Sequence, residues 1–440
     1  MRNVLTRRNV RAGVLAGIAG CLYVAACSDS DNAAPTTPDA GKFDVLQPPS
    51  LPDAEPVRPW VVGGHNHVCA LLEDDSLRCW GRNAFGELGN PPVITEADGG
   101  YAFDGATVFS WQPLRPAMTK ASAIALGGLG QWPQDPAATC VINEGRVFCW
   151  GADTSGALGR GPESEATATR PHPEAALVQQ LPPAEQVVTN GESSCAISNV
   201  GEVWCWGVLH LRGKARTPQQ IPLPSGHTAT QLSIGQQHIC AVLEDKTVAC
   251  WGWNTFGQLG RVKADADPDG VTPFPTLVPS LRDVLQIATG SFATCALTQF
   301  GGVLCFGAGN GYGEPGVEAH PLPHRMSLPE DHFITQIVAG RYHMCALLSI
   351  GDVWCWASNY EGELGFGEFD PDGSRFTPEY SNVPVKVQRL PLPAKAIAAG
   401  SSFTCATLED HNVWCWGDDP RAANEPRPSK RELRPRKIGF

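Results

Sequence analysis

The chain has 440 residues and a formal net charge of −12, from 45 acidic and 33 basic residues. The basic residues form no stripe, so nucleic acid is not an expected partner, because phosphate contacts need clustered Lys and Arg. The 47 glycines and 38 prolines are typical of many short strands joined by turns. The length is sufficient for a large core or for several domains.

Residues 1–27 are predicted to be a lipoprotein export signal. Four arginines at positions 2, 7, 8 and 11 precede an uncharged stretch from Ala12 to Ala26, which is too short for a comfortable membrane-spanning helix. The tetrapeptide that ends at Cys27 resembles a bacterial lipobox, whose cysteine is acylated and becomes the mature N-terminus. Cys21 is the alternative, but it would leave an unusually apolar start to the mature chain.

Residues 28–56 contain several prolines, few large apolar residues and no clear periodicity. This composition predicts a flexible spacer. Together with a lipid anchor, the spacer predicts a protein tethered to a membrane of the cell envelope, at the outer membrane or the cell surface. The folded part is then expected over residues 57–440.

A cysteine-flanked segment, best seen from Cys195 to Trp206, recurs seven times in that folded part. If Cys195 and Cys205 oppose each other in an antiparallel hairpin, Ala196 faces Trp204 and a three-residue loop ends at Gly201. Such loops commonly end in a residue at positive φ, where glycine is favoured. The second copy is one residue shorter and leaves a two-residue turn, so its cysteines also stay opposed.

Opposed residues of antiparallel strands lie within reach of a disulfide, so we expect one disulfide in each copy. Zinc is the alternative, but structural zinc sites usually have cysteine gaps of about two to four residues. The two remaining cysteines of the 16 are Cys21 and Cys27 in the signal. The expected pairs are Cys69–Cys79, Cys140–Cys149, Cys195–Cys205, Cys240–Cys250, Cys295–Cys305, Cys345–Cys355 and Cys405–Cys415.

Each copy also contains a Pro-led apolar strand, a strand that ends in Gly, and a glycine turn after the second cysteine. Successive first cysteines lie 45 to 71 residues apart. Repeats of this length with four short strands predict an all-β fold, a β-propeller of seven four-stranded antiparallel blades. A tryptophan–aspartate repeat propeller is the alternative, but its dipeptides do not occur at blade spacing.

The motifs G-x-x-H-x-C-A-L, V-x-C-W-G and N-x-x-G-x-L-G, in that order, resemble the regulator of chromosome condensation repeat family over about residues 57–440. The resemblance implies a seven-bladed β-propeller. The cysteine pairs depart from the family and are consistent with an exported form, and copies three and seven lack the final L-G. The sixth copy carries the motifs at Gly340, His343, Cys345, Ala346, Leu347, Val353, Cys355, Trp356, Asn359, Gly362, Leu364 and Gly365.

The first copy lacks a Pro-led strand, and the C-terminal segment from Pro435 to Ile438 matches one. We expect this tail to complete the first blade or the blade at the seam. Ring closure of this kind removes exposed edge strands, which otherwise invite aggregation.

An aromatic residue follows the second cysteine of each copy, and it is expected in the core between blades; carbohydrate stacking is the alternative. His67, His238 and His343, two residues before a cysteine, are expected to hydrogen-bond a neighbouring backbone rather than to act in catalysis or metal binding. The glycines five residues before a cysteine are expected at bulges or tight turns. The aromatic residues are Trp80, Trp150, Trp206, Trp251, Phe306, Trp356 and Trp416.

Two acidic loops partly match the spacing of a calcium loop. The loop from Asp265 to Gly270 has Thr276 where the twelfth position needs Glu. The other loop offers Glu368, Asp370, Asp372 and Glu379 at the right offsets, although Glu holds the first place. The commoner alternative is a solvated turn, so no metal or other cofactor is predicted and these residues remain calcium candidates.

A long segment between the first two copies, from Pro91 to Met118, is expected to be an insertion loop. Its four aromatic residues are Tyr101, Phe103, Phe109 and Trp111. Aromatic residues on a long loop often mark a recognition surface, so these four are candidate binding residues; capping the end of the propeller is the equal alternative.

No nucleophile elbow, zinc-protease motif or phosphate-binding loop occurs in the sequence. The favoured hypothesis is a lipid-anchored, extracytoplasmic propeller that binds a protein or a cell-surface polymer without catalysis. The alternative is a lyase or hydrolase with a pocket at the central channel. An enzyme should gather His and carboxylates at one channel mouth, whereas a binding protein should present an aromatic or charged loop face.

Overall fold

The computed structural model describes residues 60–64, 66–91, 109–114, 118, 120–128, 135–162, 170–209, 213–224, 226–262, 270–308, 319–366, 368–369, 376–418 and 435–438. These residues all belong to one compact unit, Pro48–Phe440. Within the described ranges, no helix is long and apolar enough to cross a membrane. The predicted signal and spacer, with Cys21 and Cys27, lie outside the described residues.

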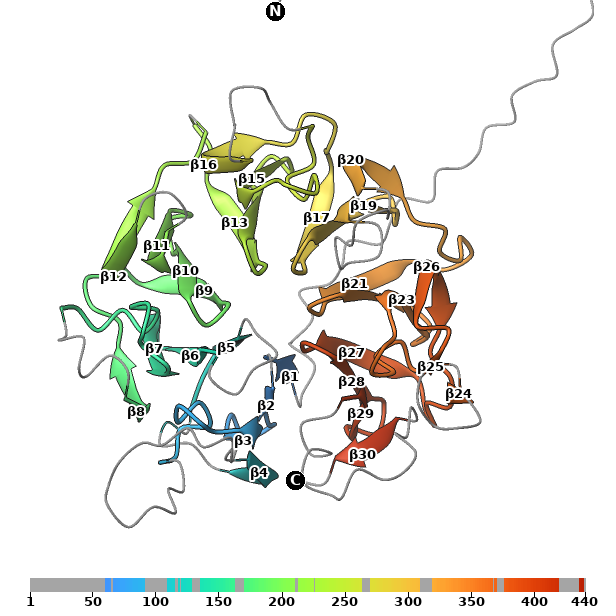
Figure 1. Ribbon diagram of the computed structural model, residues 1–440, viewed down its shortest axis with the longest axis horizontal. Helices are drawn as coiled ribbons and strands as arrows, with labels where there is room; N and C mark the ends of the chain where they lie inside the picture. Colours follow the sequence, from blue (N-terminus) through green and yellow to red (C-terminus); the bar gives the residue numbers. More distant parts are fainter. Residues whose placement is uncertain are drawn as a thin grey trace, which may run out of the picture. The chain divides into compact units, whose positions relative to one another are not determined.

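Seven four-stranded antiparallel sheets form the blades of a propeller and follow one another in chain order around a central axis (Figure 1). The predicted fold class is therefore confirmed. Blades one to three contain β1 (Trp60–Gly63), β2 (His67–Leu71), β3 (Leu77–Arg82), β4 (Phe109–Leu114); β5 (Ala123–Gly128), β6 (Ala137–Asn143), β7 (Arg146–Gly151), β8 (His172–Leu177); and β9 (Ala184–Thr189), β10 (Ser193–Ser198), β11 (Val203–Val208), β12 (Lys214–Ile221).

Blades four to seven have the same plan, and blade six carries a small additional ribbon, β24 (Glu368–Phe369) with β25 (Phe376–Thr377). Their strands are β13 (Ala229–Ile234), β14 (His238–Leu243), β15 (Val248–Trp253), β16 (Val271–Leu277); β17 (Val284–Thr289), β18 (Ala293–Thr298), β19 (Val303–Ala308), β20 (Ala319–Arg325); β21 (Ile334–Ala339), β22 (His343–Leu348), β23 (Val353–Ser358), β26 (Tyr380–Lys386); and β27 (Ala394–Ala399), β28 (Phe403–Leu408), β29 (Val413–Gly417), β30 (Arg436–Ile438).

The strand that ends in Gly is innermost in each blade and the Pro-led strand is outermost (Figure 1). The sequence repeat is therefore offset from the blade by one strand, because the Pro-led strand pairs with the hairpin that precedes it. In blade six, for example, Cys355 of β23 pairs with Val385 of β26. The first copy lacks a Pro-led strand because that strand would belong to the previous blade.

The cysteine hairpins have the predicted register. Cys195 pairs with Cys205 and Ala196 with Trp204. The predicted loop glycine Gly201 has φ 78°, and Lys246 holds the same place with φ 61°. All seven expected disulfides are present, with Cα atoms 4.0 to 4.2 Å apart.

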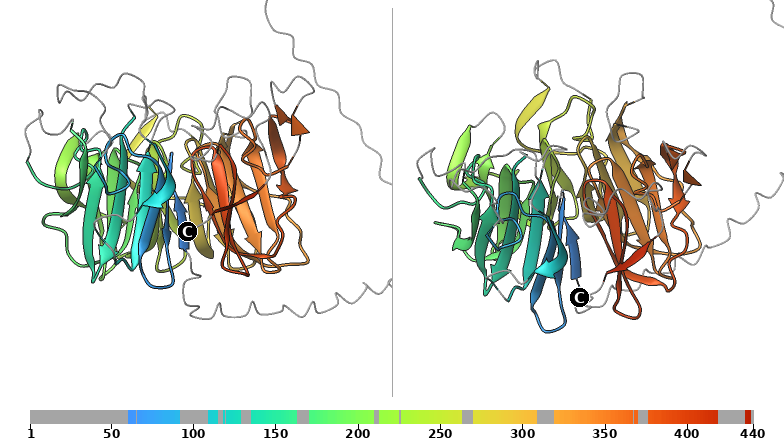
Figure 2. Two further views of the ribbon diagram at one scale, coloured as in Figure 1. Left: turned by 90° about the horizontal axis from the view of Figure 1, so that it is seen from below. Right: turned by 60° about the horizontal axis from the view of Figure 1, so that its bottom comes forward.

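The blades have two distinct faces, seen edge-on in Figure 2. Because the strands are antiparallel, the turn after the innermost strand and the connection to the outermost strand emerge at the same end of each blade. We call this end the loop face. The opposite end, the hairpin face, carries the turns between the two cysteine strands, such as the turn that ends at Gly201.

The C-terminal strand β30 completes blade seven, not blade one. Ile438 pairs with Val413 of β29 and is 2% exposed, whereas blade one obtains its outer strand from β4. Blades one and seven pack directly against each other through a core that includes Val61, Trp80 and Phe403. The ring is therefore closed by packing between two blades that are each continuous in sequence.

The aromatic residues after the second cysteines fill the spaces between blades, as predicted. Six tryptophans and Phe306 are 0 to 5% exposed. Trp150 Nε1 donates to the carbonyl of Glu87 at 3.0 Å, and Trp206 Nε1 donates to the carbonyl of Ala157 at 2.7 Å. In both pairs the acceptor lies in the glycine turn of the preceding blade, so these two turns cap the indole of the next blade.

The glycine turn also inserts a leucine beside this aromatic residue. Leu88, Leu158, Leu259 and Leu364, from blades one, two, four and six, are all 0% exposed. The glycine that follows is required, because a Cβ at Gly159, where φ is 65°, would lie 2.7 Å from Val178 Cγ1. Four spaces between blades are thus filled in the same manner.

The turn of blade six buries a carboxyl group that has no basic partner among the described residues. Glu363 accepts hydrogen bonds from Ser358 Oγ and from the backbone N–H of Glu361. Burial raises its pKa to about 7. In blade one the matching Glu87 instead forms an ion pair with Arg82, 2.8 Å from Nε to Oε1.

We expect Ile438→Ala to lower the free energy of unfolding by about 2–5 kcal/mol, because it leaves a cavity at the seam between blades one and seven. Thermal unfolding should show a correspondingly lower melting temperature. Lys437→Ala, in the same strand but exposed, serves as the control. Equal melting temperatures for both variants and the parent chain would show that β30 does not hold the ring closed.

We expect Glu363→Gln to raise stability at pH 8 but not at pH 5. The carboxyl pKa is about 7 in the folded state and about 4.5 when unfolded, so rising pH ionises the unfolded chain first and stability falls between these values. At pH 8 the free energy of unfolding of the variant should exceed that of the parent protein by about 3 kcal/mol. Gln258 holds the matching place in blade four and accepts the equivalent backbone bond from Phe256, so the substitution fits the turn.

Denaturant unfolding at the two pH values would measure this effect. The matched control is Glu87→Gln, which breaks the buried ion pair with Arg82 and should destabilise the protein at both pH values. A Glu363→Gln variant whose gain in stability is the same at pH 5 and pH 8 would contradict the raised pKa.

Candidate functional site

The repeated histidines are structural, but their partner differs from the predicted backbone. His67 Nε2 lies 3.0 Å from Thr139 Oγ1 of the next blade, and Thr139 Oγ1 donates to the carbonyl of Glu87. The hydroxyl proton is thereby committed to that carbonyl, so the imidazole carries its proton on Nε2. The same relay joins His238 to Thr294 and Gln258, and His343 to Thr404 and Glu363.

Burial keeps the imidazoles of His67 and His343 neutral. It lowers the pKa of His67 to about 4 and that of His343 to about 3, because desolvation penalises the charged ring. Both rings are at most 1% exposed. They are therefore held in the wall between blades, away from solvent.

The central channel opens on the loop face through a ring of backbone atoms. The N–H of Ser291 donates to the carbonyl of Arg341, the N–H of Arg341 to Ser401, and the N–H of Ser401 to Gly64. These bonds join blades five, six, seven and one. A Cβ at Gly340 would lie 2.5 Å from the carbonyl oxygen of Gly400, so the predicted tight-turn glycine is needed for the close approach of neighbouring blades.

The channel wall is held by glutamines on the innermost strands. Gln336 Oε1 accepts from the N–H of Ile397, and Gln336 Nε2 donates to the carbonyl of the same residue, both at 2.9 Å. Gln186 and Gln286 bridge to the next blade in the same way. None of the described residues that line the channel is His, Asp or Glu, so this part of the channel offers no general acid or base.

An aromatic arc lies on the loop face, in the turns of blades four, five and six. The rings of Phe256 and Phe292 have centroids 5.1 Å apart, and those of Phe292 and Tyr342 are 6.2 Å apart. Arg341 Cζ lies 4.7 Å from the centroid of Tyr342. We call these four residues the aromatic arc; each is partly exposed.

Arg341 places a positive charge at the end of the arc beside the channel mouth, where it lines the opening. Its Nε and Nη1 atoms have no hydrogen-bond partner among the described residues, and the guanidinium lies over the face of an aromatic ring. Partly exposed aromatic side chains that end in an arginine are the composition favoured at protein-binding surfaces.

The aromatic arc was not predicted from the sequence. Three of its residues occupy the variable positions of the G-x-x-H motif, between a glycine of the channel mouth and the buried strand. These positions read Ser291-Phe292 in blade five and Arg341-Tyr342 in blade six. Variation within an otherwise regular repeat was the available signal, because positions that the fold does not constrain can carry recognition.

The predicted binding residues and calcium candidates are only partly described. Phe109 and Trp111 lie in β4, so the expected insertion loop contains the outer strand of blade one; Tyr101 and Phe103 lie outside the described residues. Glu368 lies in β24, and the Glu379 carbonyl accepts from the N–H of Asn359. Asp370 and Asp372 lie outside the described part, as does the acidic run from residue 265 to 269. Within the described part, no three His, Cys, Asp or Glu side chains form a metal-binding group.

Known proteins with similar sequences include two from eukaryotes. The ultraviolet-B receptor UVR8 of Arabidopsis thaliana is 28% identical over 383 residues, which are 81% of this chain and 76% of the receptor. The guanine nucleotide exchange factor SRM1 of Saccharomyces cerevisiae is 25% identical over 417 residues, which are 80% of each protein.

Solved structures have the same fold. Yeast RCC1 (Prp20) superimposes with a TM-score of 0.67 at 24% identity, over 83% of this chain and 84% of that one. Human WBSCR16 gives a TM-score of 0.61 at 18% identity, over 78% and 85%. The family model described as the RCC1-like domain matches residues 135–438, and the RCC1 repeat model matches residues 61–87. The chain therefore belongs to the RCC1-like domain family.

Proposed function

We propose that this chain is a non-catalytic, protein-binding propeller that uses the loop face, and that a lipid on Cys27 anchors it outside the cytoplasm. The observation that carries the binding role is the aromatic arc, which ends in Arg341 beside the channel mouth. The guanidinium suits an acidic group of the partner, and the rings suit an apolar side chain.

The channel gives no support to the lyase or hydrolase alternative. Its described lining is formed by aliphatic, glycine, serine, threonine, asparagine and glutamine residues, with Arg341 at the mouth. A protein partner is consistent with relatives of this fold: yeast RCC1 (Prp20) has been solved bound to Kap60. This likeness supports a binding role by analogy and does not identify the partner.

The seven disulfides support a location outside the cytoplasm, because cytosolic thiols are normally kept reduced. The lipobox-like segment supports a membrane anchor, with the spacer of residues 28–56 between membrane and propeller. The cell envelope, at the outer membrane or the surface, is the location that we propose.

We expect Arg341→Ala/Tyr342→Ala to weaken capture of the main partner from an envelope extract by more than about tenfold, because the change removes central anchor side chains. Quantitative mass spectrometry of the captured proteins would measure the loss. The control is Phe300→Ala/Ile350→Ala on the hairpin face, where both side chains are exposed. If only this control variant captured less partner, the binding surface would lie on the hairpin face instead.

We expect Cys27→Ser to abolish incorporation of labelled fatty acid into the protein in its native host and to release it from the membrane fraction. Cys21→Ser should leave both properties unchanged, since that cysteine lies within the segment to be removed. Labelling that survives Cys27→Ser but not Cys21→Ser would assign the lipid to Cys21. Labelling that persists in both variants would contradict a lipid anchor on either cysteine.

A further inference from the structure

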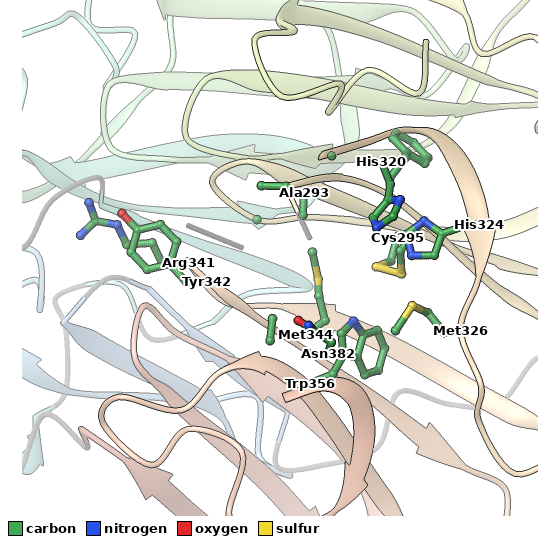
Figure 3. Close-up of a pocket in the computed structure, with 16 residues that line it drawn as sticks. Ala293, Cys295, His320, His324, Met326, Arg341, Tyr342, Met344, Trp356 and Asn382 are labelled. Carbon is green, nitrogen blue, oxygen red and sulfur yellow. A yellow bond between two sulfur atoms is a disulfide. The ribbon is translucent and has the colours of Figure 1, made fainter. Parts of the chain in front are cut away.

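A cavity of about 200 Å³ lies between blades five and six (Figure 3). Its floor includes the disulfide between Cys295 and Cys305, and Trp356 forms part of its wall. Side chains from two blades reach this cavity, and four of them carry an imidazole or a thioether.

Two of these donors are imidazoles on the outer strand β20. His320 pairs with Gly307 and His324 with Cys305, so both lie next to the same strand β19. Their ring centroids are 4.5 Å apart, and Figure 3 shows the rings side by side next to the disulfide. His324 Nδ1 is buried without a hydrogen-bond partner among the described residues, and imidazole nitrogen is the commonest metal ligand in proteins.

The other two donors are thioethers. Met326 follows β20, and Met344 enters from β22 of blade six and lines the same cavity (Figure 3). Met344 reaches across the space between the blades: a Cβ placed on Gly290 of blade five would lie 3.4 Å from its Cε. The three side-chain torsions of methionine allow each sulfur to move without a change in the backbone.

The other blades provide an internal comparison. The backbone N–H of Met326 donates to the carbonyl of Val303, and the residues that make the equivalent bond in blades two, four and six are Val178, Val278 and Val387. The fold thus accepts valine at the position that Met326 occupies in blade five. The residue before the first cysteine, Met344 here, is Thr in blades two, five and seven. The chain has only four methionines in 440 residues, and two line this cavity.

From this gathering of two imidazoles and two thioethers, we infer that the cavity between blades five and six binds a soft monovalent cation of the Cu(I) class. His320, His324, Met326 and Met344 are the proposed ligands. Thioether and imidazole donors suit Cu(I), whereas Mg²⁺, Ca²⁺ and Mn²⁺ need oxygen ligands. No carboxylate is among the described residues that line the cavity, and the two cysteines are already oxidised to a disulfide.

The test is a competition titration of the purified full chain with Cu(I). The protein would carry Cys21→Ser/Cys27→Ser, which removes the two thiols outside the disulfides. Cu(I), kept reduced with ascorbate under nitrogen, would be partitioned between the protein and the chromogenic chelator bicinchoninate. We expect one Cu(I) to be retained per chain and the melting temperature to rise on loading, because the ion binds the folded state.

Met326→Leu/Met344→Leu should weaken Cu(I) binding by more than about tenfold, since even loss of a group behind a metal ligand costs that much. Leucine keeps the apolar volume, so a role in packing alone would leave the affinity unchanged. Met118→Leu, the same substitution at a methionine packed between blades one and two, is the matched control.

His324→Gln should weaken Cu(I) binding as the double methionine substitution does, and Zn²⁺ should not displace Cu(I) at equal concentration. The inference would be overturned if the chelator removed all Cu(I) from the parent protein. Equal affinities for the parent and the Met326→Leu/Met344→Leu protein would overturn it as well, because the retained ion would then lie elsewhere.

Discussion

The contact between the glycine turn of one blade and the indole of the next fixes how neighbouring blades meet, and among the described residues it joins blades one and two, two and three, and six and seven. A single carbonyl, such as that of Glu363, accepts from both Trp416 Nε1 and Thr404 Oγ1. Thr404 Oγ1 in turn accepts a hydrogen bond from Nε2 of His343 in the preceding blade. Aromatic bulk fills the wedge while the hydrogen bonds fix its orientation. Blades that are connected only by short segments are thereby held in one geometry.

Where this arrangement is changed, the molecule acquires its distinctive surfaces. The space between blades five and six contains a cavity lined by two methionines. Blades two, four and six have valine at the position of Met326, and blades two, five and seven have threonine at the position of Met344. The aromatic arc passes through the same region, because Tyr342 borders the cavity and Arg341 borders both the cavity and the channel mouth. The regularly packed spaces between blades make the ring rigid. The space between blades five and six carries the imidazole and thioether groups, and its rigid neighbours keep them in place.

Most of the local structure could be predicted from the sequence, because each hairpin carries its own register. Opposed cysteines fixed the pairing of Cys195 with Cys205, and the repeated aromatic residue was correctly placed in the core. Contacts between blades could not be predicted in this way. His67 meets Thr139, which is 72 residues away, and no spacing within one copy indicates which residue of the next copy will face it. The aromatic arc could not be predicted for the same reason, since its rings come from three copies.

The disulfides have a consequence for biogenesis. Each links two strands of one hairpin, 9 or 10 residues apart. Under the export that we propose, correct partners would therefore leave the export machinery almost together. A chain that oxidises as it emerges, first cysteine with second and third with fourth, reaches the native connectivity without reshuffling. An isomerase would then have little to correct, and the repeats could be stapled one by one before the last blade is available to close the ring.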